Sequence, residues 1–224
     1  MNATVPTLSL LEARILGVLI EKQHTVPDIY PLSLNALTAG CNQKTSRDPM
    51  LHASEAEVQA GIDRLRGASL VVESSGGRVM RYAHNVERVL ALPSQAVALL
   101  AAMMLRGPQT IGELRINCDR LHRFADGSAV EGFLHELADR DAGALVVMLP
   151  RLAGARENRW MHLLSGPPAD VPAEAGMTPA PRRDDTLQAE IDALKQSIAE
   201  LRDEIASLKT ALDRLRTAPG SDNT

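Results

Sequence analysis

Histidine and cysteine are the residues of this chain best suited to metal binding or catalysis, and their spacing supports neither. The six histidines form no metal-ligand spacing with one another or with the cysteines, Cys41 and Cys118. The glycines of 74–77 fit a hairpin turn better than a phosphate-binding loop, and no serine elbow or acidic pair stands out. The sequence therefore predicts no catalytic residue, no metal site, no cofactor and no enzyme.

Phosphate contact by cations in loops is the chemistry that remains. One polar segment with Lys and Arg, residues 42–49, follows the apolar helix pattern at 34–41. Two further Arg-bearing segments lie in the predicted hairpins. The candidate contacts to a nucleic acid or to a protein partner are Gln43, Lys44, Arg47, Arg64, Arg78, Arg81, Arg151 and Arg156. The alternative is that these are solvated charges on ordinary turns.

The elements that would position these residues are written twice. The apolar triplet at 34, 37 and 41 recurs 77 positions later, and the triplet at 58, 62 and 65 recurs 72 positions later. Val71-Val72 recurs as Val146-Val147 before a second Arg-bearing segment. Each copy has the order of three helices and a hairpin, which is the order of a winged helix-turn-helix.

Helix starts are marked by Ser or Thr followed three residues later by Glu, the capping-box pattern. The four boxes are Ser9/Glu12, Ser54/Glu57, Thr110/Glu113 and Ser128/Glu131. With the apolar spacing, they predict helices at 10–22, 33–41, 55–67, 94–106, 111–121 and 129–140. Leu11, Ile15, Val18 and Leu19 form the predicted inner face of the first helix. Strands are predicted at 70–73, 78–83, 144–149 and 159–163.

The predicted fold is mainly α with small β wings, that is α+β. It consists of winged-helix domains at 8–90 and 92–165, a Pro-rich linker at 166–183 and a coiled-coil helix at 184–216. Five of the 13 prolines lie in the linker region.

Apolar residues after the linker alternate in spacings of four and three, the heptad pattern of a coiled coil. They are Leu187, Ile191, Leu194, Ile198, Leu201, Ile205, Leu208, Leu212 and Leu215. Ile at the a positions, Leu at d and the flanking charges favour a parallel homodimer, although a trimer stays open. The alternative is an amphipathic helix that folds back onto the same chain.

Charge weighs against ordinary groove recognition of DNA. Residues 1–90 carry nine basic and nine acidic residues, and 91–165 carry eight of each. The remaining residues carry seven basic and eleven acidic ones, which accounts for the net charge of −4. Nucleic-acid-binding domains usually show a basic stripe, whereas both predicted third helices expose carboxylates. With aromatics at 2%, a base-stacking platform is not expected either.

Localisation follows from what the sequence lacks. No signal peptide is evident, and the longest apolar run, 96–105, is too short to cross a bilayer. Each cysteine lies at an equivalent apolar helix position, which predicts a buried thiol and no disulfide. We expect a cytoplasmic protein without membrane contact.

Several long strings resemble the YceH-like family of uncharacterised bacterial proteins. They are LEARILGVLIEKQ (11–23), YPLSLN (30–35), CNQKTSRDP (41–49), LRGPQTIGELR (105–115) and RENRWMHLLSG (156–166). The resemblance covers about 8–166 and implies a tandem winged-helix fold in a cytoplasmic bacterial protein, with DNA binding inferred and no catalytic residues. It gives weight to the loop 42–49, in which Lys44 and Arg47 are the leading surface candidates.

Two functions stay open on the sequence. The first is a transcription-associated DNA-binding dimer that contacts phosphates through loops and wings. The alternative is a protein-interaction scaffold without nucleic-acid binding, similar in plan to the tandem winged-helix subunits of bacterial condensins. The family resemblance puts DNA slightly ahead.

Overall fold

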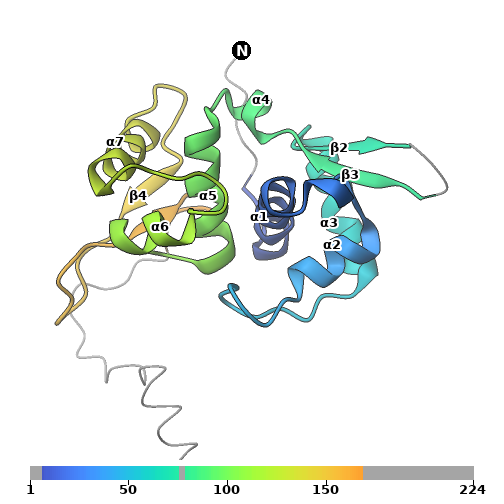
Figure 1. Cartoon of the computed structure of the whole chain (residues 1–224), viewed down its shortest axis with the longest axis horizontal. Helices are drawn as coiled ribbons and strands as arrows, with labels where there is room; N and C mark the ends of the chain where they lie inside the picture. The colour runs from blue at the N-terminus through green and yellow to red at the C-terminus, as the bar shows by residue number, and fades with distance from the viewer. Residues whose placement is uncertain (1–6, 76–78, 169–224) are drawn as a thin grey trace, which may run out of the picture. The chain divides into compact units, whose positions relative to one another are not determined.

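The computed structural model describes residues 7–75 and 79–168, and this part of the chain is a mixture of helices and small antiparallel sheets (Figure 1). The first half contains α1 (Leu10–Thr25), the 3-10 turn η1 (Pro27–Ile29), β1 (Leu32–Ser33), α2 (Leu34–Cys41), α3 (Glu55–Gly67), β2 (Val71–Ser74), β3 (Arg81–His84) and α4 (Val86–Leu90). The second half contains α5 (Ser94–Arg106), α6 (Ile111–Asn117), α7 (Gly127–Ala138), β4 (Val146–Met148) and β5 (Trp160–His162). The predicted α+β class is confirmed.

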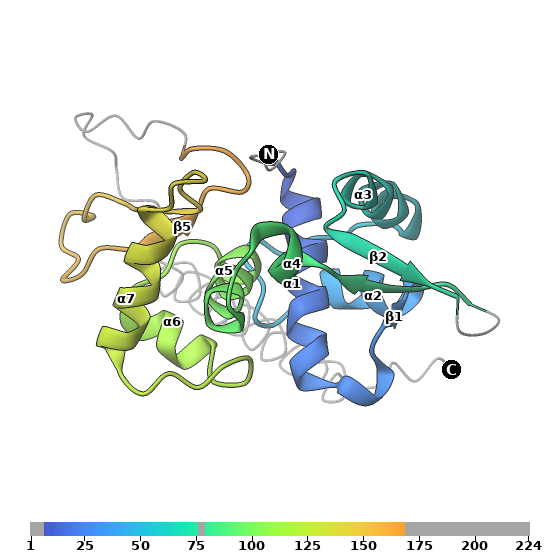
Figure 2. The same cartoon turned by 90° about the horizontal axis from the view of Figure 1, so that it is seen from above.

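Helices α1 and α5 lie side by side, and each of them is buried all around its central turns (Figure 2). Nine consecutive residues of α1, Glu12 to Ile20, and ten of α5, Ala96 to Leu105, are buried. The sequence prediction of a single inner face on the first helix was therefore incomplete. That helix packs against α2 and α3 on one side and against α5 on the other.

Glycine allows α1 to approach its neighbours closely. A Cβ atom added at Gly17 of α1 would lie 2.9 Å from Cγ of Leu105 on α5. Two backbone hydrogen bonds also join the halves, from Leu8 N to Leu164 O at 2.7 Å and from Asp48 N to Leu105 O at 2.8 Å. The two halves accordingly belong to one compact unit.

In each half, one or two residues just before the second helix form a β-bridge or short strand, and this segment pairs with the hairpin that comes later in the chain. In the first half the sheet order is β1-β3-β2, and Leu32 of β1 is opposite Tyr82 of β3. In the second half β4 pairs with β5, and Gln109 forms a bridge to Trp160 of β5. The sequence pattern predicts the hairpins but not these preceding pairings, because two residues or fewer give no periodic signal.

Three of the four predicted capping boxes are present, at Ser9, Ser54 and Thr110. The fourth prediction, Ser128/Glu131, was wrong. Asp126 is the N-cap of α7: its Oδ1 accepts from Ala129 N at 2.9 Å and from Ser128 Oγ at 2.7 Å. The carboxylate takes the free N–H of the first turn, so the helix begins at Gly127, two residues before the predicted start.

The predicted coiled-coil helix and the linker from 169 onward lie outside the described residues. The dimerisation residues from Leu187 to Leu215 therefore stay predictions. Among the helices of residues 7–75 and 79–168, none has the length and apolar character needed to cross a membrane.

Candidate nucleic-acid interface

The loop between α2 and α3, residues 42–53, is fixed at both ends and in its middle. The side chain of Asn42 donates to Ala53 O at 2.7 Å and accepts from Ala53 N at 2.8 Å, which closes the loop on itself. In its middle, the N–H of Asp48 donates to the end of α5. This loop, which a helix-turn-helix would turn toward its ligand, instead bridges the two halves of the chain.

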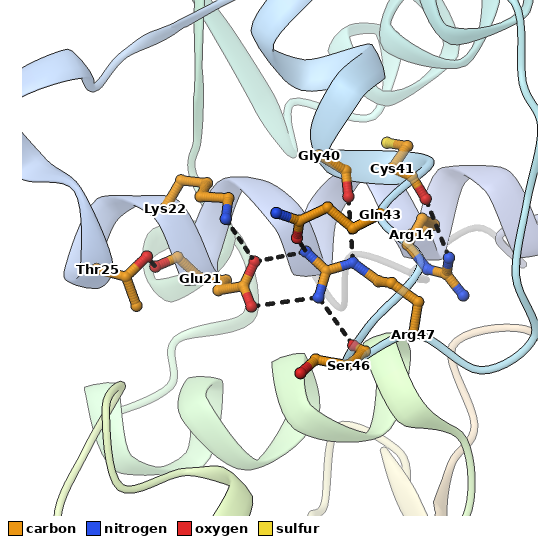
Figure 3. Close-up of polar contacts among 9 residues, drawn as sticks. All are labelled: Arg14, Glu21, Lys22, Thr25, Gly40, Cys41, Gln43, Ser46 and Arg47. Carbon is orange, nitrogen blue, oxygen red and sulfur yellow. Dashed lines mark hydrogen bonds and ion pairs between the residues drawn. The ribbon is translucent and has the colours of Figure 1, made fainter.

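Arg47 lies beneath this loop and not on its surface (Figure 3). Only 3% of the residue is exposed. Its guanidinium donates to both carboxylate oxygens of Glu21 on α1, at 3.2 and 2.6 Å, and to the backbone oxygens of Gly40 at 3.1 Å and Ser46 at 2.8 Å. The expectation that Arg47 is a surface cation was therefore wrong, because all of its nitrogens are used to fix the loop to α1 and α2.

Arg14 of α1 is a second guanidinium under the same loop, and it is 0% exposed. It donates to Cys41 O at 3.2 Å and to Pro49 O at 2.7 Å, whereas no carboxylate of the described residues pairs with it. Burial and the nearby Arg47 cation lower the pKa of this guanidinium. Arg14 and Arg47 thus hold the start and the end of the 41–49 segment.

Glu21 is the counter-charge of this cluster. Burial acts to raise the pKa of its carboxyl, but the hydrogen bonds and charge of Arg47 outweigh burial and hold that pKa below its ordinary value. Sequence reasoning missed both Arg14 and Glu21. The available signal for Arg14 was a charged residue within the mostly apolar stretch of α1, at a position where a solvated side chain has no room. Glu21 lies just after that stretch and gave no such signal.

The other candidates in the loop differ in exposure. Gln43 is half-buried, and its side-chain oxygen accepts from Arg47. Lys44 is exposed and takes part in no ion pair or side-chain hydrogen bond of the described residues. Of the two leading candidates, Lys44 alone is placed where it could meet a ligand.

The cations of α3 are paired with carboxylates. Arg64 donates to Glu12 of α1, and Arg66 pairs with Glu73 of β2 at 2.8 Å. Burial opposes ionisation of Glu12, yet the Ser9 backbone N–H and Arg64 together keep its pKa below the ordinary value. Since Glu55, Glu57 and Asp63 on the same helix are exposed, α3 offers no net positive face.

Helix α7 is less suited still to a phosphate backbone. Its twelve residues, Gly127–Ala138, contain neither Lys nor Arg. Glu131 and Glu136 are exposed on it. Neither third helix therefore has the basic face that groove recognition needs.

Arg81 of β3 is exposed but is also used within the first half. Its guanidinium donates to Pro31 O at 2.8 Å and to Ile29 O at 3.3 Å, so it holds the segment before β1 against the hairpin. Arg78 lies outside the described residues.

The loop between β4 and β5, residues 149–159, differs from all these sites, and we term it the β4–β5 arm. The N–H of Leu149 donates to Arg159 O at 2.7 Å at its base, and Ala155 N donates to Leu152 O at 3.0 Å at its tip. Arg151 and Arg156 flank this tip turn, and both are exposed. Within residues 7–75 and 79–168 no ion pair or side-chain hydrogen bond involves either of them.

The cysteines and the other metal-binding residue types form no metal site in the described part of the chain. Cys41 and Cys118 are buried free thiols, and burial raises the pKa of each to about 12. Among the described residues, no group of three or more His, Cys, Asp or Glu is placed to hold a metal ion.

Comparison with known proteins gives a family but no activity. A family model described as "Protein of unknown function, DUF480" matches residues 8–155. A UPF0502 protein of Dechloromonas aromatica is 59% identical over 87% of this chain and 92% of its own length. A UPF0502 protein of Methylibium petroleiphilum is 57% identical over 87% of this chain and 82% of its own length. A UPF0502 protein of Burkholderia orbicola is 66% identical over 71% of this chain and 67% of its own length. These similarities are consistent with the resemblance drawn from the sequence.

Proposed function

The chain belongs to the DUF480 family of proteins of unknown function, and we propose that it is a dimeric, non-enzymatic DNA-binding protein of the cytoplasm. It is built from two winged-helix units, and it contacts phosphates through loops and the β4–β5 arm. The coiled-coil segment holds two such chains together. As a DNA-binding dimer, the protein would take part in transcription.

The order of elements supports the winged-helix assignment. Each half runs helix, strand pairing, helix, helix and hairpin, with β1 opposite β3 in one copy and Gln109 opposite Trp160 in the other. A short strand that precedes the second helix and pairs with the hairpin gives each half a small sheet beside its helices. This repeated pairing extends the repeat beyond the apolar spacing on which it was first based.

The distribution of cations is the observation that carries the DNA proposal. In the first half, Arg14, Arg47, Arg64, Arg66 and Arg81 all donate to groups of the same chain. In the second half, Arg151 and Arg156 are exposed at the tip of a projecting loop, with no partner among the described residues. Exposed guanidiniums match phosphate oxygens in geometry and charge.

This mode of binding is weak by construction. The carboxylates of α3 and α7 repel a phosphate backbone, so the proposed interface rests on a few attractive contacts, from Lys44 and the arm. Two chains joined by a coiled coil act by multivalency, which raises the apparent affinity without any new contact.

A fluorescence anisotropy titration of a labelled mixed-sequence duplex at several salt concentrations tests the proposal. We expect binding that weakens with salt, and the slope of log K against log salt concentration should fall by about 1 when Lys44 is replaced by Ala. Arg88→Ala is the matched control, since Arg88 is exposed on α4, away from the loop and the arm. Absence of binding at low salt would reject the DNA proposal.

The acidic third helices favour a second candidate, the protein-interaction scaffold. An exposed helix face with Glu131 and Glu136 and no cation suits a basic protein segment better than DNA. If this candidate holds, proteins captured from a cell extract are lost with Glu131→Lys/Glu136→Lys and retained with Arg151→Ala/Arg156→Ala. The opposite pattern would favour DNA.

A further inference from the structure

The β4–β5 sheet has one face that packs inside the protein and a second face that carries partly exposed apolar side chains. Val146 and Trp160 point inward and are buried, and the ring of Trp160 lies against that of His135 on α7. Because side chains alternate along a strand, the residues between them point outward. We term these residues the outer face: they are half-buried, they belong neither to the described core nor to the side chains packed against it, and they are Val147, Leu149, Met161 and Leu163.

The first half of the chain shows that the fold itself does not require an apolar outer face. The outward positions of its hairpin carry Val72, Ser74, Arg81 and Ala83, of which two are polar. In the second half, by contrast, residues 145–149 form an unbroken apolar run, LVVML. Such runs are typical of strands that are covered on both faces. The outer face therefore has the composition of a surface on which another element packs.

The charges beside the outer face indicate the kind of element that fits it. Arg159 is exposed and pairs with the end of β4, and the exposed Arg151 and Arg156 continue this positive end into the arm. Within 149–159, Glu157 is the one carboxylate. The exposed Asp141 precedes β4 and so lies toward the opposite end of the sheet. A partner with apolar residues along its length and carboxylates toward the arm would match both features.

We propose that the outer face binds an acidic amphipathic helix of another protein, with the apolar stripe of that helix on the sheet and its carboxylates on the arginines of the arm. Helices commonly cover the apolar faces of sheets, and arginine pairs with a carboxylate through two hydrogen bonds. The leucines and isoleucines of 184–216 are used elsewhere in the proposed dimer, where they face one another. Duplex DNA would use the arginines but would leave the outer face in water, so this inference goes beyond the DNA binding proposed above and does not depend on it.

The test uses the full-length chain and a labelled synthetic helix of about 18 residues, which is about 27 Å long. Leu recurs at every third or fourth position of this peptide, and Glu flanks the Leu stripe. We expect it to bind at least about tenfold more tightly than a twin with Lys in place of Glu, or than a scrambled peptide of the same composition without a stripe. Arg151→Ala/Arg156→Ala should reduce the difference between the Glu and Lys peptides, whereas the control Arg88→Ala should not.

A second variant separates apolar docking from mere charge attraction. Leu149→Ser/Met161→Ala introduces the residues of the first half, Ser74 and Ala83, at the equivalent outward positions and keeps every charge. We expect the affinity for the Glu peptide to fall at least about tenfold, because the lost side chains supply the apolar contact. Val72→Ala, on the outward face of the first half, is the matched control and should leave the affinity unchanged. Circular dichroism would verify that each variant is folded.

Three results would overturn the proposal. An unchanged affinity of Leu149→Ser/Met161→Ala, or equal binding of the scrambled peptide, would mean that charge alone accounts for the contact. Absence of Glu-peptide binding to the full-length chain would remove the contact altogether. Binding that appears only after deletion of 184–224 would mean that a part of the same assembly already occupies the outer face. The DNA titration is a separate measurement, so failure of the helix proposal and failure of the proposed function are distinguishable.

Discussion

Arg47→Ala should destabilise the protein severely and should not act mainly on ligand binding. The substitution removes the guanidinium's hydrogen bonds to Gly40 O, Ser46 O and both oxygens of Glu21. It leaves the Glu21 carboxylate, of which only 17% is exposed, without its main counter-charge. Breaking a buried pair by removal of one partner costs about 3–5 kcal/mol in free energy of unfolding.

Urea denaturation followed by circular dichroism measures this loss. With an m-value of about 2 kcal/mol per molar urea, a loss of 4 kcal/mol lowers the midpoint by about 2 M. Lys44→Ala, three residues away and exposed, should change the free energy of unfolding by less than about 0.5 kcal/mol. The contrast between the two variants tests the burial of Arg47 directly.

A double-mutant cycle of Arg47→Ala with Glu21→Ala tests the pairing itself. We expect a coupling free energy of about 1–3 kcal/mol, since either single substitution removes the same Arg47–Glu21 pair. The remaining loss belongs to the hydrogen bonds with the carbonyls of Gly40 and Ser46 and with the side-chain oxygen of Gln43. An Arg47→Ala protein with a wild-type midpoint and a weakened affinity for DNA would refute the structural role and restore Arg47 as a surface contact.

Three further predictions follow from packing, titration and the heptads. Gly17→Ala should lower the free energy of unfolding by about 1–3 kcal/mol, because the added Cβ would lie 2.9 Å from Cγ of Leu105. Gly132→Ala, in open space on α7, should raise the free energy of unfolding by up to about 1 kcal/mol. Chemical denaturation measures both changes, and equal effects would contradict the close approach of α1 to α5. Burial lowers the pKa of His162 to about 4, and burial with the nearby His24 does the same to His84. As the pH falls from about 6.5 to 4, these histidines therefore take up protons in the unfolded state before they do so in the folded state. Between pH 7 and pH 5 each histidine should lower the free energy of unfolding by about 2 kcal/mol. His162→Gln should abolish about half of the combined loss, whereas a free energy of unfolding that does not change with pH in the wild type would be the contrary result. Deletion of 184–224 should convert a dimer to a monomer in light scattering, and an unchanged mass would reject the coiled coil.

Local signals predicted much of the fold. The apolar spacing and the capping boxes placed α3 at 55–67 and α5 at 94–106, the bounds that the structure has. The start of α7 was misplaced because Ser128/Glu131 matches the box pattern, while Asp126 two residues earlier is the stronger cap. Competing caps a few residues apart differ by too little free energy for a pattern to rank them.

The candidate site was less predictable, because charge in a loop does not reveal burial. Lys44 and Arg47 look alike in the sequence, yet one is exposed and the other is buried against Glu21, 26 residues earlier in the chain. Long-range pairs of this kind depend on how α1 and α2 pack. Arg151 and Arg156 were correctly placed in a loop, but the tip turn between them emerges from its hydrogen bond and the φ of Gly154.

The glycine-mediated contact of α1 with α5 has a consequence for any partner that touches both halves. Because this seam is closely packed and buried, the separation of α3 from α7, and of either from the β4–β5 arm, is set before a ligand arrives. A partner that spans the halves would lose little entropy in aligning one with the other, whereas a flexible linker between the halves would make that loss large. A partner that contacts both halves would therefore need contact points at the spacing that this seam sets.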